Sequence, residues 1–139
     1  MIQNMSVFNH TFQALENAID ISQKRQGVIA SNISNLDTPG YKAREIDFQA
    51  TLKTAMASDN EMPATSMART HSGHLGGEKD SGVDVEIHEA PSDFDGLNWV
   101  GVDSEMKKLM ENKLVYQTAV EAMMRKISII KETIREGGR

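Results

Sequence analysis

The sequence predicts a mainly α fold in which long N- and C-terminal helices pack as a coiled coil, joined by a short helix and an irregular, partly extended middle. Apolar side chains recur in alternating steps of four and three near both ends of the chain, the spacing of helices that wind around each other. The middle lacks this pattern, and the 139 residues include only four Phe, two Tyr and one Trp. We therefore divide the chain into an N-terminal helix at 1–36, a middle at 37–101 and a C-terminal helix at 102–139.

Each terminal segment carries one apolar seam. The N-terminal seam comprises Phe8, Phe12, Leu15, Ile19, Ser22, Gln26, Ile29, Ile33 and Leu36. The C-terminal seam comprises Val102, Met106, Leu109, Lys113, Tyr116, Val120, Met123, Ile127, Ile130 and Ile134. Because so small a chain has little else to cover two stripes, the seams predict assembly rather than catalysis. The polar positions Ser22, Gln26 and Lys113 either set register and partner choice, as polar seam residues do, or face solvent.

The first helix is expected from about Ser6, a suitable N-cap, to about Asn35. A strong stop follows it. Pro39 disfavours helical geometry at the residue before it, and Gly40 accepts a positive φ without steric cost. The Pro-Gly pair fits the two central positions of a type II turn.

The middle contains three weaker signals. A short helix with one apolar face is expected at 47–56, capped by Asp47. The segment 57–82 is polar and rich in Ser, Gly, Thr and Met, as loops are. Strict alternation of apolar and polar residues at 83–88 predicts a short strand, for which no partner strand is evident. The segment 91–101 is irregular.

The second helix is expected to begin near Asp103 as its N-cap, with Glu105 in the favourable first turn. It should run to about Arg135 and stop at the following pair of glycines. Four of the nine Met residues lie on or beside its seam, at positions 106, 110, 123 and 124. They either fill the helix–helix core or form an adaptable surface, because the thioether side chain fits differently shaped neighbours.

Charge and composition exclude several classes of function. The formal net charge is −5, and residues 37–95 carry five basic and twelve acidic side chains, which makes nucleic acid an unexpected partner. No cysteine is present, so disulfides and cysteine chemistry are excluded. No apolar run approaches the length of a lipid-spanning segment, and the N-terminus lacks the pattern of a cleaved signal. These features alone suggest a cytoplasmic protein.

The sequence offers no convincing catalytic or metal site. His71 and His74 have a metal-like spacing, but the glycines around them indicate a solvated loop. His10 and His88 fall on predicted exposed positions. No nucleophile elbow or phosphate-binding loop occurs. We therefore predict a protein that is not an enzyme and has no catalytic residue, cofactor or metal.

One stretch resembles a known family signature. Residues 30–44, with the sequence Ala-Ser-Asn-Ile-Ser-Asn-Leu-Asp-Thr-Pro-Gly-Tyr-Lys-Ala-Arg, closely resemble the signature of bacterial flagellar basal-body rod proteins. They depart from it at Ser34, where Ala is common. The residues that follow, at 45–48, and the start of the second helix, at 102–117, are similar to the small members that form the proximal rod. Together the similar segments cover about residues 8–53 and 95–134.

The resemblance implies a structural, non-catalytic subunit of the proximal rod that self-assembles through its terminal helices into a tubular drive shaft for motility. The expected partners are itself, other flagellar rod and basal-body proteins, and the flagellar type III export apparatus. Export without a cleaved signal would carry the subunit from the cytoplasm to the periplasm-spanning rod, which replaces the cytoplasmic expectation. The seam residues expected to be buried between subunits are Phe8, Phe12, Leu15, Ile19, Ile29, Ile33, Leu36, Met106, Leu109, Tyr116, Val120, Met123, Ile127, Ile130 and Ile134.

The resemblance also singles out residues around the turn and near the N-terminus. The motif residues are Asn32, Asn35, Thr38, Pro39, Gly40, Tyr41, Lys42 and Arg44. The two asparagines are expected to bond backbone groups near the helix end. Tyr41 and Arg44 either anchor the turn onto a neighbouring helix or complete a turn within the chain. Phe8 and Phe12 match the element that early export substrates present to the export gate, although seam packing explains them equally well. A soluble coiled-coil adaptor or export chaperone is the alternative function.

Overall fold

The computed structural model describes residues 3–58, 83–90 and 101–138. Within these ranges the chain forms helices α1 (Gln3–Ser34), α2 (Phe48–Ser58) and α3 (Val102–Gly137) and the two-residue strands β1 (Arg44–Glu45) and β2 (His88–Glu89). The predicted mainly α fold with long terminal helices is confirmed. Nearly all of the predicted loop at 57–82 and of the irregular segment at 91–101 lies outside the described residues.

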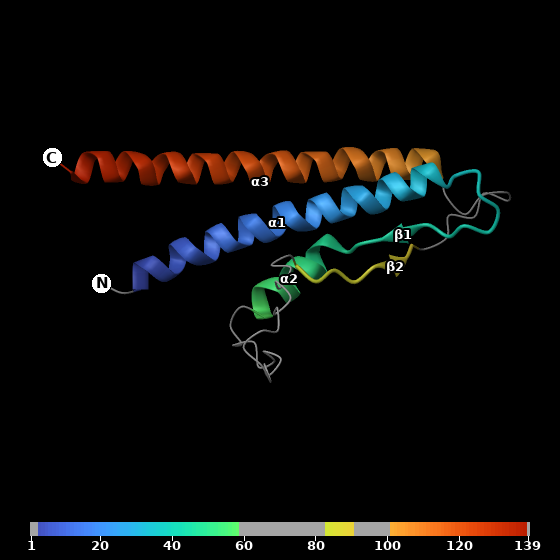
Figure 1. Cartoon of the computed structure of the whole chain (residues 1–139), viewed down its shortest axis with the longest axis horizontal. Helices are drawn as coiled ribbons and strands as arrows, with labels where there is room; N and C mark the ends of the chain where they lie inside the picture. Colours follow the sequence, from blue (N-terminus) through green and yellow to red (C-terminus); the bar gives the residue numbers. More distant parts are fainter. Residues whose placement is uncertain (1–2, 59–82, 91–100, 139) are drawn as a thin grey trace, which may run out of the picture.

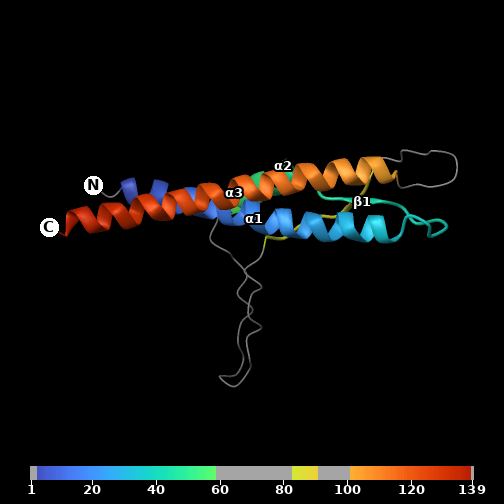
Figure 2. The same ribbon diagram turned by 90° about the horizontal axis from the view of Figure 1, so that it is seen from above.

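The long helices α1 and α3 lie against each other in antiparallel orientation, with both chain termini at the same end (Figure 1). They are close at the end where α1 finishes and α3 begins, and they separate towards the termini. Seen from above, the two helices cross each other (Figure 2). The helix α2 and the β1–β2 ribbon lie on the side of α1 that faces away from α3, so α1 is the central layer.

The helix α1 begins three residues earlier than expected and ends in the predicted turn. Ser6 lies inside the helix, so its assignment as the N-cap is wrong. Gln3 and Met5, which precede Ser6, both have high helix propensity, so the helix extends through them. After the helix, Gly40 has φ 75°, and the Tyr41 N–H donates to the Thr38 carbonyl at 3.2 Å. The predicted type II turn is therefore confirmed.

The helix α2 has the predicted cap. The Asp47 carboxylate oxygen Oδ1 accepts a hydrogen bond from the Ala50 N–H at 3.0 Å, while its carbonyl accepts the first helical bond from Thr51. This is the N-cap arrangement, which satisfies a backbone donor that the first helical turn leaves open. The helix continues two residues beyond the predicted end at 56.

The predicted strand at 83–88 is wrong in its extent. Only His88 of that range belongs to a strand, and β2 pairs antiparallel with β1 in the register Arg44 with Glu89 and Glu45 with His88. The partner was not evident because two residues after a turn carry no alternating pattern. At the other end of this segment, the Val83 N–H donates to the Asp20 carboxylate at 2.7 Å, and the Lys24 ammonium donates to the Val83 carbonyl. Contacts with a helix thus replace sheet pairing there.

The helix α3 begins at Val102 with Gly101 as its N-cap and no side-chain cap. The assignment of Asp103 as the N-cap is therefore wrong. The Glu105 N–H already donates to the Gly101 carbonyl at 3.1 Å, which places Asp103 inside the first turn. Its carboxylate still suits the positive end of the helix dipole. The helix ends at Gly137 with Gly138 as its C-cap, at the predicted stop.

The buried interior of the described residues is small and mixed in polarity. Its apolar members are Ala18, Ile21, Ile29, Ala43, Ile46 and Ala119. Its polar members are Ser22, Asn32, Thr51, Glu105 and Asn112. The buried residues of α3 are Glu105, Asn112 and Ala119, so two of the three are polar and none is a large apolar side chain.

Candidate functional site

Asn32 holds the end of α1, the turn and α3 together. Its side-chain amide donates to the Arg44 carbonyl at 2.7 Å and to the Glu105 carboxylate at 2.9 Å. Its oxygen Oδ1 accepts from the Arg44 N–H at 3.0 Å and from the Tyr41 hydroxyl at 3.2 Å. The residue is fully buried, and these four bonds satisfy both donors and both acceptor positions of the amide. One side chain therefore fixes where the chain leaves α1 and where α3 begins.

The remaining motif residues complete a turn within the chain. The Asn35 amide donates to the Ser31 carbonyl at 2.8 Å, so both asparagines bond backbone groups as expected. The Thr38 hydroxyl donates to the Asn35 side-chain oxygen at 3.2 Å. The Lys42 ammonium lies 2.8 Å from the Glu89 carboxylate, on the side of the turn that carries β2. Tyr41 and the Arg44 backbone contact Asn32, whereas Pro39 and the Arg44 side chain are exposed.

A chain of charged groups extends from Asn32 along the helix contact. The Lys108 ammonium lies 3.1 Å from the Glu105 carboxylate and 3.4 Å from the Glu45 carboxylate. The Arg25 guanidinium lies 3.9 Å from Glu45 on its other side. Glu105 is only 2% exposed, so its charge is compensated by Lys108 and by the Asn32 amide rather than by water. The position of Glu105 in the first turn predicts a favourable interaction with the helix dipole. It does not predict burial, because a charged side chain is normally expected at the surface.

The N-terminal seam is partly covered within the subunit. Of its apolar side chains that the structure describes, Ile29 is buried and the others are half-buried: Phe12, Leu15, Ile19, Ile33 and Leu36. Leu36 lies in the turn rather than in the helix, and the Phe8 side chain is outside the described part. The seam pattern did not predict the burial of Ile21 and Ala18, which lie off the seam.

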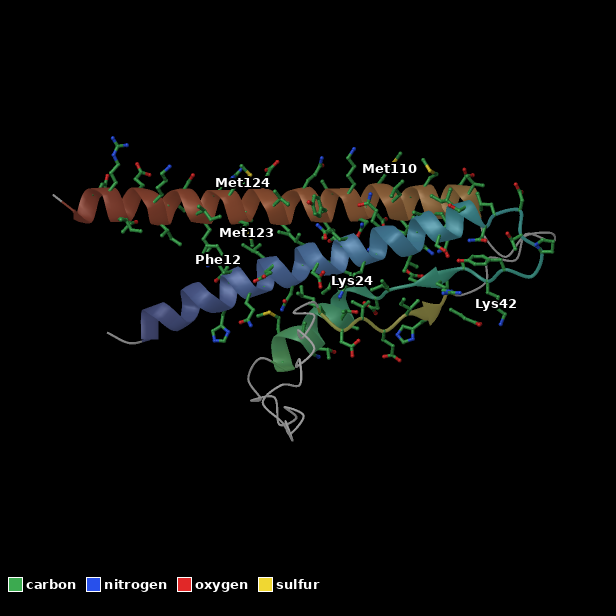
Figure 3. The ribbon with its side chains drawn as sticks, viewed as in Figure 1. Phe12, Lys24, Lys42, Met110, Met123 and Met124 are labelled. Carbon is green, nitrogen blue, oxygen red and sulfur yellow. The ribbon has the colours of Figure 1, made fainter. Side chains whose placement is uncertain are left out.

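The C-terminal seam lies to one side of the face that contacts α1. Its half-buried members are Leu109, Tyr116, Val120, Met123 and Ile130. Its exposed apolar members are Val102, Met106, Ile127 and Ile134, which we call the exposed seam. Figure 3 shows Phe12 and Met123 pointing into the space between the long helices, and Met110 and Met124 pointing away from α1. The Lys126 ammonium of α3 lies 5.0 Å from the centre of the Phe12 ring of α1.

The polar seam positions differ in their roles. Ser22 is buried, and its hydroxyl donates to the Ala18 carbonyl of its own helix at 2.8 Å. Gln26 and Lys113 are exposed. Of the three, therefore, only Ser22 lies in the contact between α1 and α3.

The described residues hold no arrangement suited to catalysis or metal binding. No three His, Asp or Glu side chains in this part of the chain gather closely enough to hold a metal ion, and His71 and His74 lie outside it. An open groove of about 660 Å³ between α1, β1 and residues 83–87 is lined by aliphatic side chains, among them Val28 and Ile46, and by polar and charged ones. Among the described helices, none has a stretch long and apolar enough to cross a membrane.

Comparison with known proteins identifies the family. Residues 12–42 match the family described as flagella basal body rod protein. The chain is 36% identical to the flagellar basal body rod protein FlgB of Bacillus subtilis (strain 168) over 97% of its own length and 100% of that protein. It is 31% identical to FlgB of Escherichia coli (strain K12) over 88% of its length and 91% of that protein. With FlgB of Borrelia hermsii it shares 34% identity over 81% of its length and 86% of that protein. The chain belongs to the FlgB family of flagellar basal-body rod proteins.

Proposed function

We propose that this chain, a structural subunit of the flagellar basal-body rod, works by packing the exposed seam of α3 against neighbouring copies and other rod or basal-body proteins. The exposure of that seam supports the proposal most directly. Val102 is 52% exposed, Ile127 51% and Ile134 71%, and no described element of the chain covers them. Burial of apolar surface contributes about 25 cal/mol per Å², so covering these side chains between subunits favours association.

The expected place of work follows from the family. We infer that the flagellar type III apparatus exports the subunit without a cleaved signal and that it joins the part of the rod that spans the periplasm. Phe8 and Phe12 are the residues we assign to the export gate, in addition to their place on the N-terminal seam. The subunit does no covalent chemistry, and its task is mechanical. Its presence in purified basal bodies checks this location, while a protein confined to the cytoplasm would favour the adaptor or chaperone alternative.

A matched pair of isoleucines tests the assembly role. Ile127 lies on the exposed seam, and Ile129 lies off it on the same helix, with similar exposures of 51% and 60%. Ile127→Asp should abolish swimming when it replaces the wild-type gene, because a carboxylate buried between subunits has no partner there. Ile129→Asp should leave swimming close to wild type. Soft-agar motility and the amount of subunit in purified basal bodies measure both effects.

The comparison of the two variants decides the proposal. Both should retain wild-type helix content by circular dichroism, since neither side chain is buried in the subunit. Equal losses of motility, or normal motility of Ile127→Asp, would show that the exposed seam is not the contact surface.

A further inference from the structure

The two long helices contact each other through polar groups at well-separated points. Near one end, the Asn32 amide donates to the Glu105 carboxylate at 2.9 Å. Further along, the Asn112 amide donates to the Ser22 carbonyl at 2.8 Å. Asn32, Glu105 and Asn112 are each at most 2% exposed. Each of these two bonds joins a residue of α1 to a residue of α3.

The apolar seam cannot by itself decide how the helices are aligned. Every seventh residue from Leu109 is again apolar or aromatic: Tyr116, Met123 and Ile130. A slide of α3 by one heptad therefore replaces at least three of these four side chains with another apolar or aromatic one. Apolar packing is non-directional and tolerates exchanges of this kind. On this seam, several alignments have similar energies.

The neighbouring heptad row does not repeat. It reads Glu105, Asn112, Ala119, Lys126 and Thr133, five different residue types. Ala119 lies two heptads after Glu105, and Ala18 lies two heptads before Asn32, so the antiparallel alignment puts the two alanines at the same level. Both side chains are small and buried. A slide by one heptad removes Glu105 from Asn32 and Asn112 from Ser22, which leaves buried polar groups without their partners. This row distinguishes the observed alignment from its neighbours, and the ion pair of Lys108 with Glu45 at 3.4 Å favours the same alignment.

The side-chain amide of Asn112 is only half-satisfied where it lies. Its oxygen Oδ1 is buried and has no hydrogen-bond partner among the described residues. A half-satisfied buried amide costs free energy, and an aliphatic side chain of similar volume would avoid that cost. A polar residue at such a position is known to select alignment at the expense of stability.

We propose that Asn112 and the Asn32–Glu105 pair set the register of α1 against α3 and so determine how the exposed seam is presented beside the motif turn. Only the effect of the register on assembly rests on the proposed function. The register itself is a property of the isolated subunit. Asn32 holds the turn and Glu105 at once, so a change of register displaces the whole exposed seam relative to the turn.

The register can be measured directly because the chain contains no cysteine. Cysteines introduced at His10 and Lys107, both exposed, carry spin labels on the two helices. Double electron–electron resonance on the dilute subunit should give one main distance for the otherwise unchanged chain. A slip of seven residues at a rise of about 1.5 Å each changes the axial separation by about 10 Å.

Two variants and one control make the test sharp. Glu105→Leu with Asn112→Leu should keep the helices but add a second distance population, shifted by about 10 Å. The exchange Glu105→Asn with Asn112→Glu keeps composition and charge and should lengthen the main distance by about 10 Å, because Asn32 then meets its carboxylate one heptad further along α3. Lys113→Leu with Gln117→Leu, at exposed positions of the same helix, should leave one unshifted distance.

A single, unshifted distance in both register variants would overturn the inference. If the leucine variant does not fold, the distance measured in the exchange variant is sufficient for the test. In cells, the exchange variant should lose motility although it is produced and exported normally. Full motility with a shifted distance would refute the link to assembly while leaving the register assignment intact. Failure of the unaltered gene to restore motility would count against the proposed function without affecting the distances.

Discussion

Asn32 joins three parts of the chain through one side-chain amide. It bonds both backbone groups of Arg44, the Tyr41 hydroxyl and the Glu105 carboxylate. The sequence predicts that the Asn32 side chain bonds backbone groups near the helix end, and its bonds to the backbone of Arg44 confirm this. The bond to Glu105 could not be predicted, because it spans 73 positions of the chain and depends on how two helices align.

Asn32→Asp should destabilise the isolated subunit severely. The substitution keeps the shape but removes both donors and places a second carboxylate against buried Glu105, for an expected loss of about 3 kcal/mol. Asn35→Asp is the matched control, since Asn35 is only partly buried and its amide makes one bond to its own helix. Urea denaturation monitored by circular dichroism measures both. Equal losses would mean that Asn32 has no special role.

Two glycines should respond to the same substitution with opposite signs. Gly40→Ala should lower the free energy of unfolding by about 1 kcal/mol, because φ is 75° there and a Cβ strains that conformation. Gly27→Ala should raise it by about 0.5–1 kcal/mol, since this helical position has open space and alanine restricts the unfolded chain. Urea denaturation of each variant provides the values. A stabilising Gly40→Ala would contradict the assigned turn.

At the scale of elements, local signals predicted some features and missed others, since the N-caps assigned to Ser6 and Asp103 were wrong, whereas the long-range pairing was missed altogether. The α2 cap and the turn after α1 involve residues within a few positions of each other, and both are confirmed. The β1–β2 ribbon joins segments more than 40 residues apart, and its partner strand was not found from the sequence. Alternation at 83–88 reflected packing of this segment beside α1 rather than sheet pairing.

Asp47→Ala should loosen α2 without affecting the long helices. Loss of an N-cap typically costs about 1 kcal/mol, and here it leaves the Ala50 N–H without its side-chain acceptor. Hydrogen exchange at the α2 amides should accelerate, while exchange at the contact of α1 with α3 stays unchanged. Asp47→Asn keeps an acceptor at the cap and should exchange nearly as wild type does. Acceleration throughout the molecule would show that α2 is part of one cooperative unit with the long helices.

At the scale of the whole molecule, α3 is covered unevenly. Its buried residues lie between Glu105 and Ala119, whereas Ile127, Ile129 and Ile134 are at least 51% exposed. Figure 1 shows the long helices separating towards this end. Helices of this kind owe most of their stability to tertiary packing, so we expect the end of α3 to need contacts with neighbouring subunits.

The free subunit should therefore fray at its terminal end. In dilute solution, amides beyond about residue 126 should exchange roughly tenfold faster or more than those near Asn112. Helix content should rise with subunit concentration as the exposed seams become covered. Hydrogen exchange and a concentration series of circular dichroism spectra measure the two effects. Full helicity at the lowest concentration, without self-association, would argue that the seam needs no partner.

The sequence by itself determined the features that depend on near neighbours: two long helices, the turn at Pro39–Gly40, the cap at Asp47 and the family resemblance at 30–44. The helices, the turn and the cap follow from periodicity, a required φ and a side chain that reaches its own backbone, whereas the resemblance rests on the residues at 30–44 themselves. Only the tertiary structure decided which heptad row of α3 faces α1, because adjacent rows are both compatible with a helix. It placed Glu105 and Asn112 inside and left Met106, Ile127 and Ile134 outside. The physical reason is that buried polar bonds require particular distant partners, whereas apolar periodicity accepts any apolar surface.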